Sequence, residues 1–270
     1  MFSIAVVQMS SSNRLDENLK KMEQYMARAV EQNAQVVVFP EMAYLMGKEE
    51  DWKPHLDRYS ELLELFSQWS RHYGLYLIPG SLREPVRGSE GRFFNTLTLH
   101  GPSGNLLSKY RKIFLFRANL PDRRYEESEH CEPGNMIVVK EGSPAALGFG
   151  LCFDLRFPEL FRSLKRGGAQ LVLLPSAFTV PTGKDHWKPL LQARAIENQF
   201  FVAAPAQVGH LGDGRECYGH SMIVDPWGRV LSELADEEGL LVQTIDMGQI
   251  KKAADRVDVW ESRRNDLFKL

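Results

Sequence analysis

Short apolar runs alternate along the chain with longer segments in which apolar residues recur every three or four positions. The runs have the length of β-strands, and several are continuously apolar and rich in Val, Ile and Leu. Such runs are typical of strands that are buried on both faces. The clearest lie at residues 4–9, 35–39, 75–79, 96–100, 136–140, 146–152, 170–174, 200–204, 220–224 and 240–245.

The helical periodicity falls between these runs. We expect Asn13 to cap the first helix, because Asn is favoured at helix N-caps. Pro158 is expected to start the third helix and Gly167 with Gly168 to end it, since Pro is favoured in the first turn and Gly just past the last. The four expected helices lie at about residues 15–30, 59–69, 158–166 and 186–198.

The order of these elements predicts an α/β fold. Strands alternate with helices most clearly over residues 1–80 and 145–205, whereas elsewhere strands follow one another. This mixture indicates a mixed sheet, or two sheets, covered by helices. No linker, repeat or low-complexity tract divides the chain, and its length allows one large domain or two small ones. The polar stretch 117–135 is long for a connection, which is typical of functional or mobile loops.

Composition narrows the function classes. Of 270 residues, 43% are apolar and 25% charged, which excludes a disordered or fibrous chain. The net charge of −2 lacks the basic excess of a general nucleic-acid or membrane-surface binder. No apolar window has the length of a membrane-spanning helix, and residues 1–8 read as a strand rather than a secretion signal. With only Cys131, Cys152 and Cys217, free thiols are expected, so we expect the cytoplasm.

Three chemically capable side chains follow three predicted strands. Glu41 follows the strand 35–39 through Pro40, Lys112 follows a strand at 105–110, and Cys152 ends the run 146–152. Ligands of open α/β folds collect beyond the carboxyl ends of strands, so these groups could share one cleft. Taken singly, each has a plainer interpretation: a buried thiol, a surface or capping carboxylate, and a solvated basic turn.

The combination of these three groups suits nucleophilic catalysis. A thiol is mostly protonated at neutral pH, a neighbouring ammonium favours its thiolate, and a carboxylate can accept its proton. If the sulfur of Cys152 attacks a carbonyl, Lys112 and a backbone N–H beside Cys152 could stabilise the oxyanion. The histidines show no metal-ligand spacing, and no cofactor or metal is indicated.

Three motifs resemble the nitrilase, or carbon–nitrogen hydrolase, superfamily. They are Val-Val-Val-Phe-Pro-Glu at 36–41, Lys-Tyr-Arg-Lys at 109–112, and Gly-Phe-Gly-Leu-Cys-Phe-Asp-Leu-Arg-Phe-Pro-Glu at 148–159. They stand in the order and at the spacing of that family. The likeness continues at residues 186–187, 193–198, 219–221 and 225–228, and so covers essentially the whole chain.

The resemblance implies a fold, a reaction and roles for individual residues. The implied fold is a four-layer α-β-β-α sandwich with two mixed sheets flanked by helices, formed as one domain by residues 1–270. The implied reaction is amide hydrolysis through a thioester, with Cys152 as nucleophile, Glu41 as general base and Lys112 beside the oxyanion. Glu127, which matches a second glutamate of many members, would orient Lys112 and the substrate, and Phe153 would contribute its backbone N–H to the oxyanion.

These motifs indicate the reaction more narrowly than the identity of the substrate. The chain most resembles the branch of deaminated glutathione amidase and ω-amidase, which implies a linear amide that carries a carboxylate. We assign Arg156, Ala177 and Arg194 to substrate binding. Alternatively, Arg156 pairs with Asp154 or Glu159, and Arg194 with Glu197. Other reactions stay open: an N-carbamoyl amidohydrolase, a nitrilase, acyl transfer to an amine, or a catalytically silent binding or scaffold protein.

Two further features follow from the likeness. Relatives pair through helices, so we expect a homodimer or larger homo-oligomer, with the C-terminal tail at about 255–270 at the interface. The chain also departs from its relatives after Lys112. Many of them read Ile-His-Leu-Phe-Asp there, whereas this chain has Phe114 in place of the histidine and Arg117 in place of the aspartate.

Overall fold

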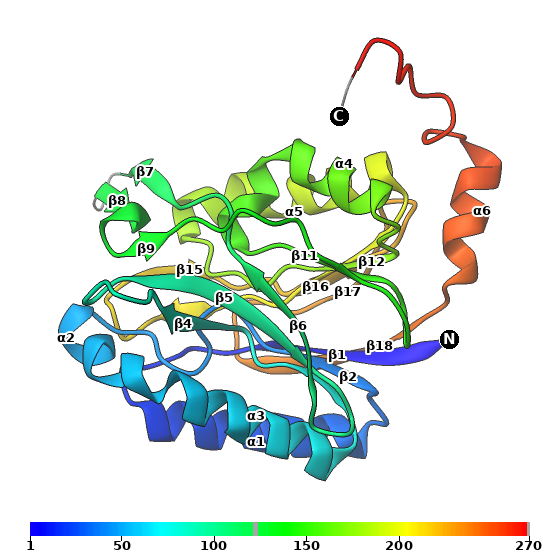
Figure 1. Cartoon of the computed structure of the whole chain (residues 1–270). Coiled ribbons are helices and arrows are strands. Elements are labelled where there is room, and N and C mark those ends of the chain that lie inside the picture. The colour runs from blue at the N-terminus through cyan, green and yellow to red at the C-terminus, as the bar shows by residue number, and fades with distance from the viewer. Residues whose placement is uncertain (121–123, 269–270) are drawn as a thin grey trace.

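Two β-sheets lie face to face, and helices cover the outer face of each (Figure 1). The computed structural model describes residues 1–120 and 124–268. Helices α1 (Leu15–Glu31) and α3 (Tyr59–Tyr73) form one outer layer, and α4 (Pro158–Arg166) and α5 (Val180–Asn198) form the other. This arrangement confirms the expected four-layer α-β-β-α sandwich.

The first sheet combines parallel and antiparallel strands. Its order is β18-β1-β2-β3-β5-β4, with β6 and β9 also paired to β5. Strands β1, β2 and β3 are parallel, and β18 runs antiparallel to β1. The strands are β1 (Phe2–Gln8), β2 (Val36–Val38), β3 (Tyr76–Ile78), β4 (Ser81–Pro85), β5 (Phe93–His100), β6 (Leu106–Arg111), β9 (Cys131–Glu132) and β18 (Gly239–Ile245).

The second sheet is also mixed. Its order is β10-β11-β12-β13-β16-β17, and the central strands β11, β12 and β13 are parallel. Two small sheets, β14-β15 and β7-β8, stand apart from it. The strands are β7 (Arg117–Asn119), β8 (Arg124–Glu126), β10 (Val139–Lys140), β11 (Leu147–Phe149), β12 (Leu171–Leu173), β13 (Phe201–Ala204), β14 (Val208–His210), β15 (Glu216–Tyr218), β16 (Met222–Val224) and β17 (Val230–Glu233).

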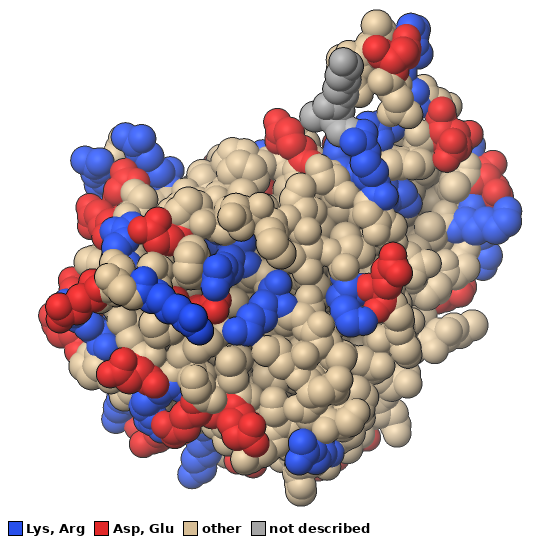
Figure 2. Space-filling model, viewed as in Figure 1, with Lys and Arg blue, Asp and Glu red and all other residues tan. Residues whose placement is uncertain are grey.

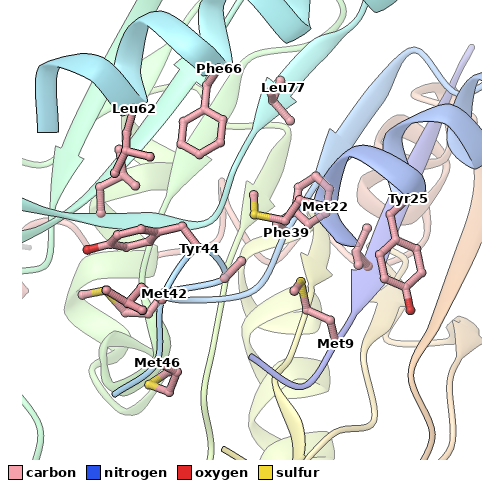
Figure 3. Packing of buried hydrophobic residues seen from close by; sticks show 14 of the residues in the cluster. Met9, Met22, Tyr25, Phe39, Met42, Tyr44, Met46, Leu62, Phe66 and Leu77 are labelled. Carbon is pink, nitrogen blue, oxygen red and sulfur yellow. The ribbon is translucent and has the colours of Figure 1, made fainter. Parts of the chain in front are cut away.

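The continuously apolar runs reflect burial on both faces of a sheet. In β2, Val36 and Val38 join the core between the two sheets, whereas Val37 points to the other face and joins the core under α1 and α3. Figure 3 shows this second core, where Met22, Phe39 and Phe66 meet between helices and strands. A third core lies between the other sheet and α4 with α5.

Several boundaries differ from the sequence-based expectation. Arg14, not Asn13, is the N-cap residue of α1, and the Asn13 side chain donates instead to Asp51 at 3.0 Å. Helix α5 begins at Val180, six residues earlier than expected. The run 136–140 forms a strand only at Val139–Lys140.

The structure also contains short elements that the periodicity did not predict. The stretch 117–135 holds three short strands and a 3-10 helix, and its residues 121–123 lie outside the described residues. Before α3 the chain forms one helical turn and a 3-10 helix. These additional helical elements are α2 (Glu49–Trp52), η1 (Lys53–Arg58) and η2 (Glu127–Glu129).

The C-terminal segment leaves the body of the sandwich. Helix α6 (Gly248–Arg256) runs along its edge, and the residues after it extend beyond the α4 layer (Figure 1). The tail contacts the body at few points, such as the Gln199 side chain, which donates to the carbonyl of Val257. Figure 2 shows charged side chains on this projecting segment and a largely uncharged face on the body below it. Residues 269–270 of the expected tail lie outside the described residues.

Candidate active site

The structure brings Glu41, Lys112 and Cys152 together. Glu41 follows β2, Lys112 directly follows β6, and Cys152 stands three residues after β11 in the opposite sheet. The Lys112 Nζ lies 3.0 Å from Glu41 Oε1, and the Cys152 thiol donates a hydrogen bond to the Glu41 carboxylate. All three residues are buried. The shared cleft expected at the strand ends is therefore present.

The turn after β11 fixes the position of the thiol. Cys152 begins a 3-10 helix, η3 (Cys152–Arg156), with a φ of +46° in the left-handed region that non-glycine residues rarely adopt. Its N–H donates to the carbonyl of Pro175, just beyond β12, at 3.0 Å. The Ala177 N–H donates to the sulfur. The Phe153 N–H lies in the first turn of η3, where N–H groups have no partner within the helix.

Two further side chains complete the cluster around Lys112. Glu127 Oε2 lies 2.8 Å from Lys112 Nζ and accepts the Phe116 N–H at 2.7 Å. The Asn95 side-chain Nδ2 donates to both carboxylates, at 2.9 Å to Glu41 and 3.1 Å to Glu127. Lys112 and Asn95 thus each bridge Glu41 and Glu127. The motif had indicated Glu127, but nothing had indicated Asn95.

Backbone hydrogen bonds fix the position of Lys112 beside this cluster. Its N–H donates to the carbonyl of Asn95 at 2.9 Å, and its carbonyl accepts the N–H of Gly134 at 2.7 Å. A Cβ on Gly134 would lie 2.2 Å from the carbonyl oxygen of Arg111, so only glycine permits this approach. Pro133 and Gly134 therefore mark a point where the backbone passes close behind Lys112.

Asp154 links the lysine segment to the cysteine turn. It accepts the Tyr110 hydroxyl at 2.6 Å, the Phe114 N–H at 2.9 Å and the Leu151 N–H at 2.8 Å. Burial raises the pKa of this fully buried carboxyl to about 6 against the hydrogen bonds that lower it. Tyr110 precedes Lys112 and Leu151 precedes Cys152, so one side chain ties together segments from two different sheets.

The charges in the cluster follow from burial and pairing. Burial raises the pKa of the Cys152 thiol well above its ordinary value, and Glu41 raises it further. Burial also raises the pKa of Glu41, but the Lys112 ammonium and the hydrogen bonds from Cys152 and Lys112 outweigh it, so this pKa lies below its usual value. Burial lowers the pKa of Lys112, yet Glu127 and Glu41 raise it well above its ordinary value.

The resting site therefore combines a neutral thiol with a charged carboxylate and a charged ammonium. We had expected the neighbouring ammonium to favour a thiolate. Here burial and the adjacent carboxylate outweigh that effect, so the proton stays on sulfur and hydrogen-bonds to Glu41. A carboxylate in this position is suited to act as a general base at the moment of attack.

A cavity of about 360 Å³ opens onto the cluster, within the size range of small-molecule sites. Phe153, Arg156 and Ala177 line it, as expected of substrate-binding and supporting residues. Cationic side chains exceed anionic ones around it. The cationic residues are Lys48, Arg83, Lys112, Arg124, Arg156 and Arg215, and the anionic ones are Glu41, Glu126, Glu127 and Asp213.

The two arginines assigned to the substrate lie in different settings. Arg156 is half-buried and packs its guanidinium against the rings of Phe153 and Phe178. In the part of the chain that the structure describes, Arg156 forms no ion pair, so neither of its alternative partners holds it. Arg194, in contrast, does not line the cavity. It pairs with Glu197 at 3.0 Å and donates to the carbonyl of Leu155, which is the alternative that the sequence left open.

Comparison with known families identifies the chain. The model of the carbon–nitrogen hydrolase family matches residues 3–255. The chain belongs to this family.

Two curated relatives with similar sequences are amidases by name. This hydrolase is 38% identical over 263 residues to the deaminated glutathione amidase of Synechocystis, covering 96% of this chain and 97% of that protein. It is 33% identical over 271 residues to the omega-amidase NIT2 of Danio rerio, covering 99% and 96%. The expected branch of the superfamily is confirmed.

A solved structure gives a direct view of a related site. The hydrolase matches a glutamate-to-glutamine mutant of the amidase from Nesterenkonia sp. AN1 with a TM-score of 0.84 and 28% identity, over 99% of this chain and 98% of that one. In that protein, acrylamide has added to the active site cysteine. Together these findings confirm the prediction of an amidase that works through a cysteine nucleophile.

The two departures after Lys112 lie outside the cavity of this hydrolase. Phe114 stacks on Phe157 with ring centroids 3.7 Å apart. Arg117 is exposed and pairs with Glu126 at 3.2 Å across the antiparallel strands β7 and β8. Neither side chain lines the cavity.

Two searches of the described residues bear on cofactors and membranes. Over residues 1–120 and 124–268, no group of three or more His, Cys, Asp or Glu side chains is arranged to hold a metal ion. Within the same ranges, no helix combines the length and the apolar character needed to cross a bilayer.

Proposed function

We propose that the protein hydrolyses a linear, carboxylate-bearing amide to an acid and ammonia through a thioester on Cys152. The observation that carries this proposal is the buried contact of a thiol with a carboxylate base that is itself paired to an ammonium. Glu41 accepts the thiol hydrogen bond, and Lys112 Nζ lies 3.0 Å from the same carboxylate.

The first half of the reaction forms the thioester. Glu41 takes the thiol proton as the sulfur of Cys152 bonds to the amide carbon, and the carbonyl oxygen becomes an oxyanion. The Lys112 ammonium and the Phe153 N–H stabilise this charge, and one such donor typically contributes about 3 kcal/mol. Glu41 then gives its proton to the nitrogen as the C–N bond breaks, and ammonia leaves.

The second half releases the acid. A water loses a proton to Glu41 as its oxygen bonds to the thioester carbon. The second tetrahedral intermediate collapses with cleavage of the C–S bond, and Glu41 returns the proton to sulfur. Glu127 holds Lys112 at 2.8 Å and Asn95 holds Glu41 at 2.9 Å throughout, and Asn95 also donates to Glu127 at 3.1 Å.

The cationic excess of the cavity supports an anionic substrate. Arg156 is the residue that we propose to bind the carboxylate on the acyl half, because its guanidinium faces the cavity and a guanidinium binds carboxylates with two parallel hydrogen bonds. The names of the two curated relatives support two substrates. One is a 2-oxo-ω-amido acid, which releases ammonia, and the other is deaminated glutathione, whose secondary amide releases an amine in the same step. Ala177 lines the same cavity, and its N–H donates to the sulfur of Cys152.

The test is a substrate panel on the wild type, C152A and C217A. The panel contains a 2-oxo-ω-amido acid, an N-carbamoyl amino acid and a nitrile, and ammonia and the acid are measured. We expect activity on the ω-amide, loss of at least about 10³-fold in C152A, and an acyl adduct on Cys152 by intact mass. C217A, which removes a buried thiol outside the cavity, should stay active.

Three results would contradict this assignment. The first is full activity in C152A. The second is turnover of only the carbamoyl compound or only the nitrile, which would favour the two related reactions instead. The third is release of no product from any member of the panel by the wild type, which would favour a binding protein.

We also propose an oligomeric state and a cellular compartment for this protein. The tail after α6 projects from the body and carries exposed apolar side chains, with Leu267 and Phe268 about 60% exposed. A second copy of the chain would cover them, so the tail supports a homodimer or larger homo-oligomer. The three cysteines are free thiols, which supports a reducing compartment, the cytoplasm.

A further inference from the structure

Arg83 lies beside the reaction cluster on the first sheet. It belongs to β4, and its register partner on β5 is Asn95, the residue that holds Glu41 and Glu127. Opposed residues on neighbouring strands point to the same face of a sheet. Arg83 lines the cavity although only 7% of the residue is exposed.

The surroundings of Arg83 hold its guanidinium in one place. Its Nη1 donates to the Tyr44 hydroxyl at 3.2 Å and to the carbonyl of Leu45 at 3.0 Å. The rings of Trp52 and Phe93 lie 5.2 and 5.4 Å from its central carbon. Figure 3 shows Tyr44 lying in the core with its hydroxyl at the end away from Phe39. These contacts hold the guanidinium of Arg83 in position, but none of them is with a negatively charged side chain.

The charge of Arg83 is not neutralised within the described residues. No carboxylate there lies within 4.0 Å of it. Its sequence neighbour Glu84 pairs with Lys109 and Arg111 instead. Its Nε is buried without a hydrogen-bond partner. A buried charge without a counter-charge is costly unless a ligand supplies one.

Other cationic groups of the cavity differ from Arg83 in this respect. Lys112 has Glu41 and Glu127, Arg215 has Asp213 at 2.6 Å, and Arg124 has Glu126 at 3.3 Å. Arg156 resembles Arg83, since it too has no ion pair in the described chain. Among the described residues, the cavity therefore contains two guanidinium groups without a carboxylate partner, Arg83 on β4 and Arg156 at the end of η3.

We propose that Arg83 is a specificity-determining residue that binds a carboxylate on the amine half of the substrate. Glu41 gives its proton to the departing nitrogen, so the amine half must lie on the Glu41 side of the cavity. Arg83 is on that side, one strand away from the Asn95 that binds Glu41. Arg156, which packs against Phe153 beside the oxyanion position, is left for the acyl half.

This assignment rests on the proposed function and extends it. A substrate with a carboxylate on each side of the scissile bond is a secondary amide, and its leaving group is an anionic amine such as an amino acid rather than ammonia. Primary amides would occupy only the Arg156 end of the cavity. They should therefore be hydrolysed less efficiently than the doubly anionic amide.

Three glutarate amides test the proposal. Glutaryl-glycine carries a carboxylate on its amine half, N-(2-hydroxyethyl)glutaramate carries a neutral hydroxyl there, and glutaramate has ammonia as leaving group. Release of glutarate is measured for the wild type, R83Q, R83K and R156Q. We expect the wild type to prefer glutaryl-glycine. R83Q should raise its KM by about 10- to 100-fold, the range for one charge-assisted interaction, and change the other two less than threefold.

The variants separate this role from a structural one. R83K keeps the charge and should recover part of the preference, whereas R156Q should weaken all three substrates because each has the acyl carboxylate. Equal losses on all three substrates in R83Q would overturn the proposal. Equal kcat/KM of the wild type on glutaramate and on glutaryl-glycine would also overturn it. This result does not depend on whether a variant folds, and it leaves the proposed function intact. Failure of the wild type on all three would overturn the proposed function as well.

Discussion

Replacement of Asn95 by alanine tests whether the two carboxylates need their shared amide donor. In the native site one NH2 group donates to Glu41 at 2.9 Å and to Glu127 at 3.1 Å. A hydrogen bond to a charged group contributes about 1.5–3 kcal/mol, so two of them contribute about 3–6 kcal/mol. In N95A both carboxylates still pair with Lys112, and water from the cavity can replace part of the lost amide contact. We therefore expect the variant to lose about 2–4 kcal/mol of this stabilisation.

This loss should appear mainly as a lower kcat, because Asn95 holds the general base Glu41 and Glu127, the partner of Lys112, rather than the substrate. At 1.4 kcal/mol per factor of ten, kcat/KM of N95A should fall by about 30- to 1000-fold. The assay is ammonia release, with thermal unfolding measured in parallel.

Asn18 provides the matched control for this variant. It is also a buried asparagine whose NH2 group makes two hydrogen bonds, to the carbonyls of Ser12 and Tyr44. N18A should lose stability while its kcat stays near the wild-type value. Unchanged kcat/KM in folded N95A would refute the idea that Asn95 positions the cluster, and so would an equal loss of kcat in N18A.

Two further predictions concern stability and assembly. Burial lowers the pKa of His100 to about 4 from 6.5, so the unfolded chain takes up the proton first and stability is lost as pH falls from 6.5 towards 4. Between pH 7 and pH 5, the free energy of unfolding measured in urea should fall by about 2 kcal/mol more for the wild type than for H100Q. An equal fall for the two proteins would contradict this prediction. Removal of residues 258–270 keeps the Val257 contact with Gln199 and should lower the mass in light scattering from an oligomer towards a monomer. An unchanged mass would exclude the tail from the interface.

The sequence was most informative where a pattern repeats or where a residue follows a strand. Runs such as 36–38 are apolar throughout because both faces of β2 are covered, and this predicted the buried sheets. Glu41 and Cys152 were expected in one cleft because each follows the carboxyl end of a strand. The structure shows that the two strands, β2 and β11, belong to opposite sheets whose ends meet at this cleft. Both inferences depend on local order along the chain.

The expectations that failed depend on contacts between distant segments. The start of α5 contains Pro181 and Gly183, which favour a turn in isolation. In the fold, Tyr218 packs so close that a Cβ on Gly183 would lie 2.3 Å from it, so helix and strand meet there because the residue is small. Asn95 and Arg83 were missed for a similar reason, since only strand pairing brings them beside the reactive groups.

The Asp154 bridge bears on how the enzyme would lose activity on heating. One carboxyl holds the turn that carries the nucleophile and the segment that carries the lysine, and these segments come from opposite sheets. Separating the reactive groups would require breaking that bridge and parting the sandwich along its central interface. Inactivation and global melting should therefore form a single cooperative transition, with no intermediate in which the scaffold survives and the chemistry is gone.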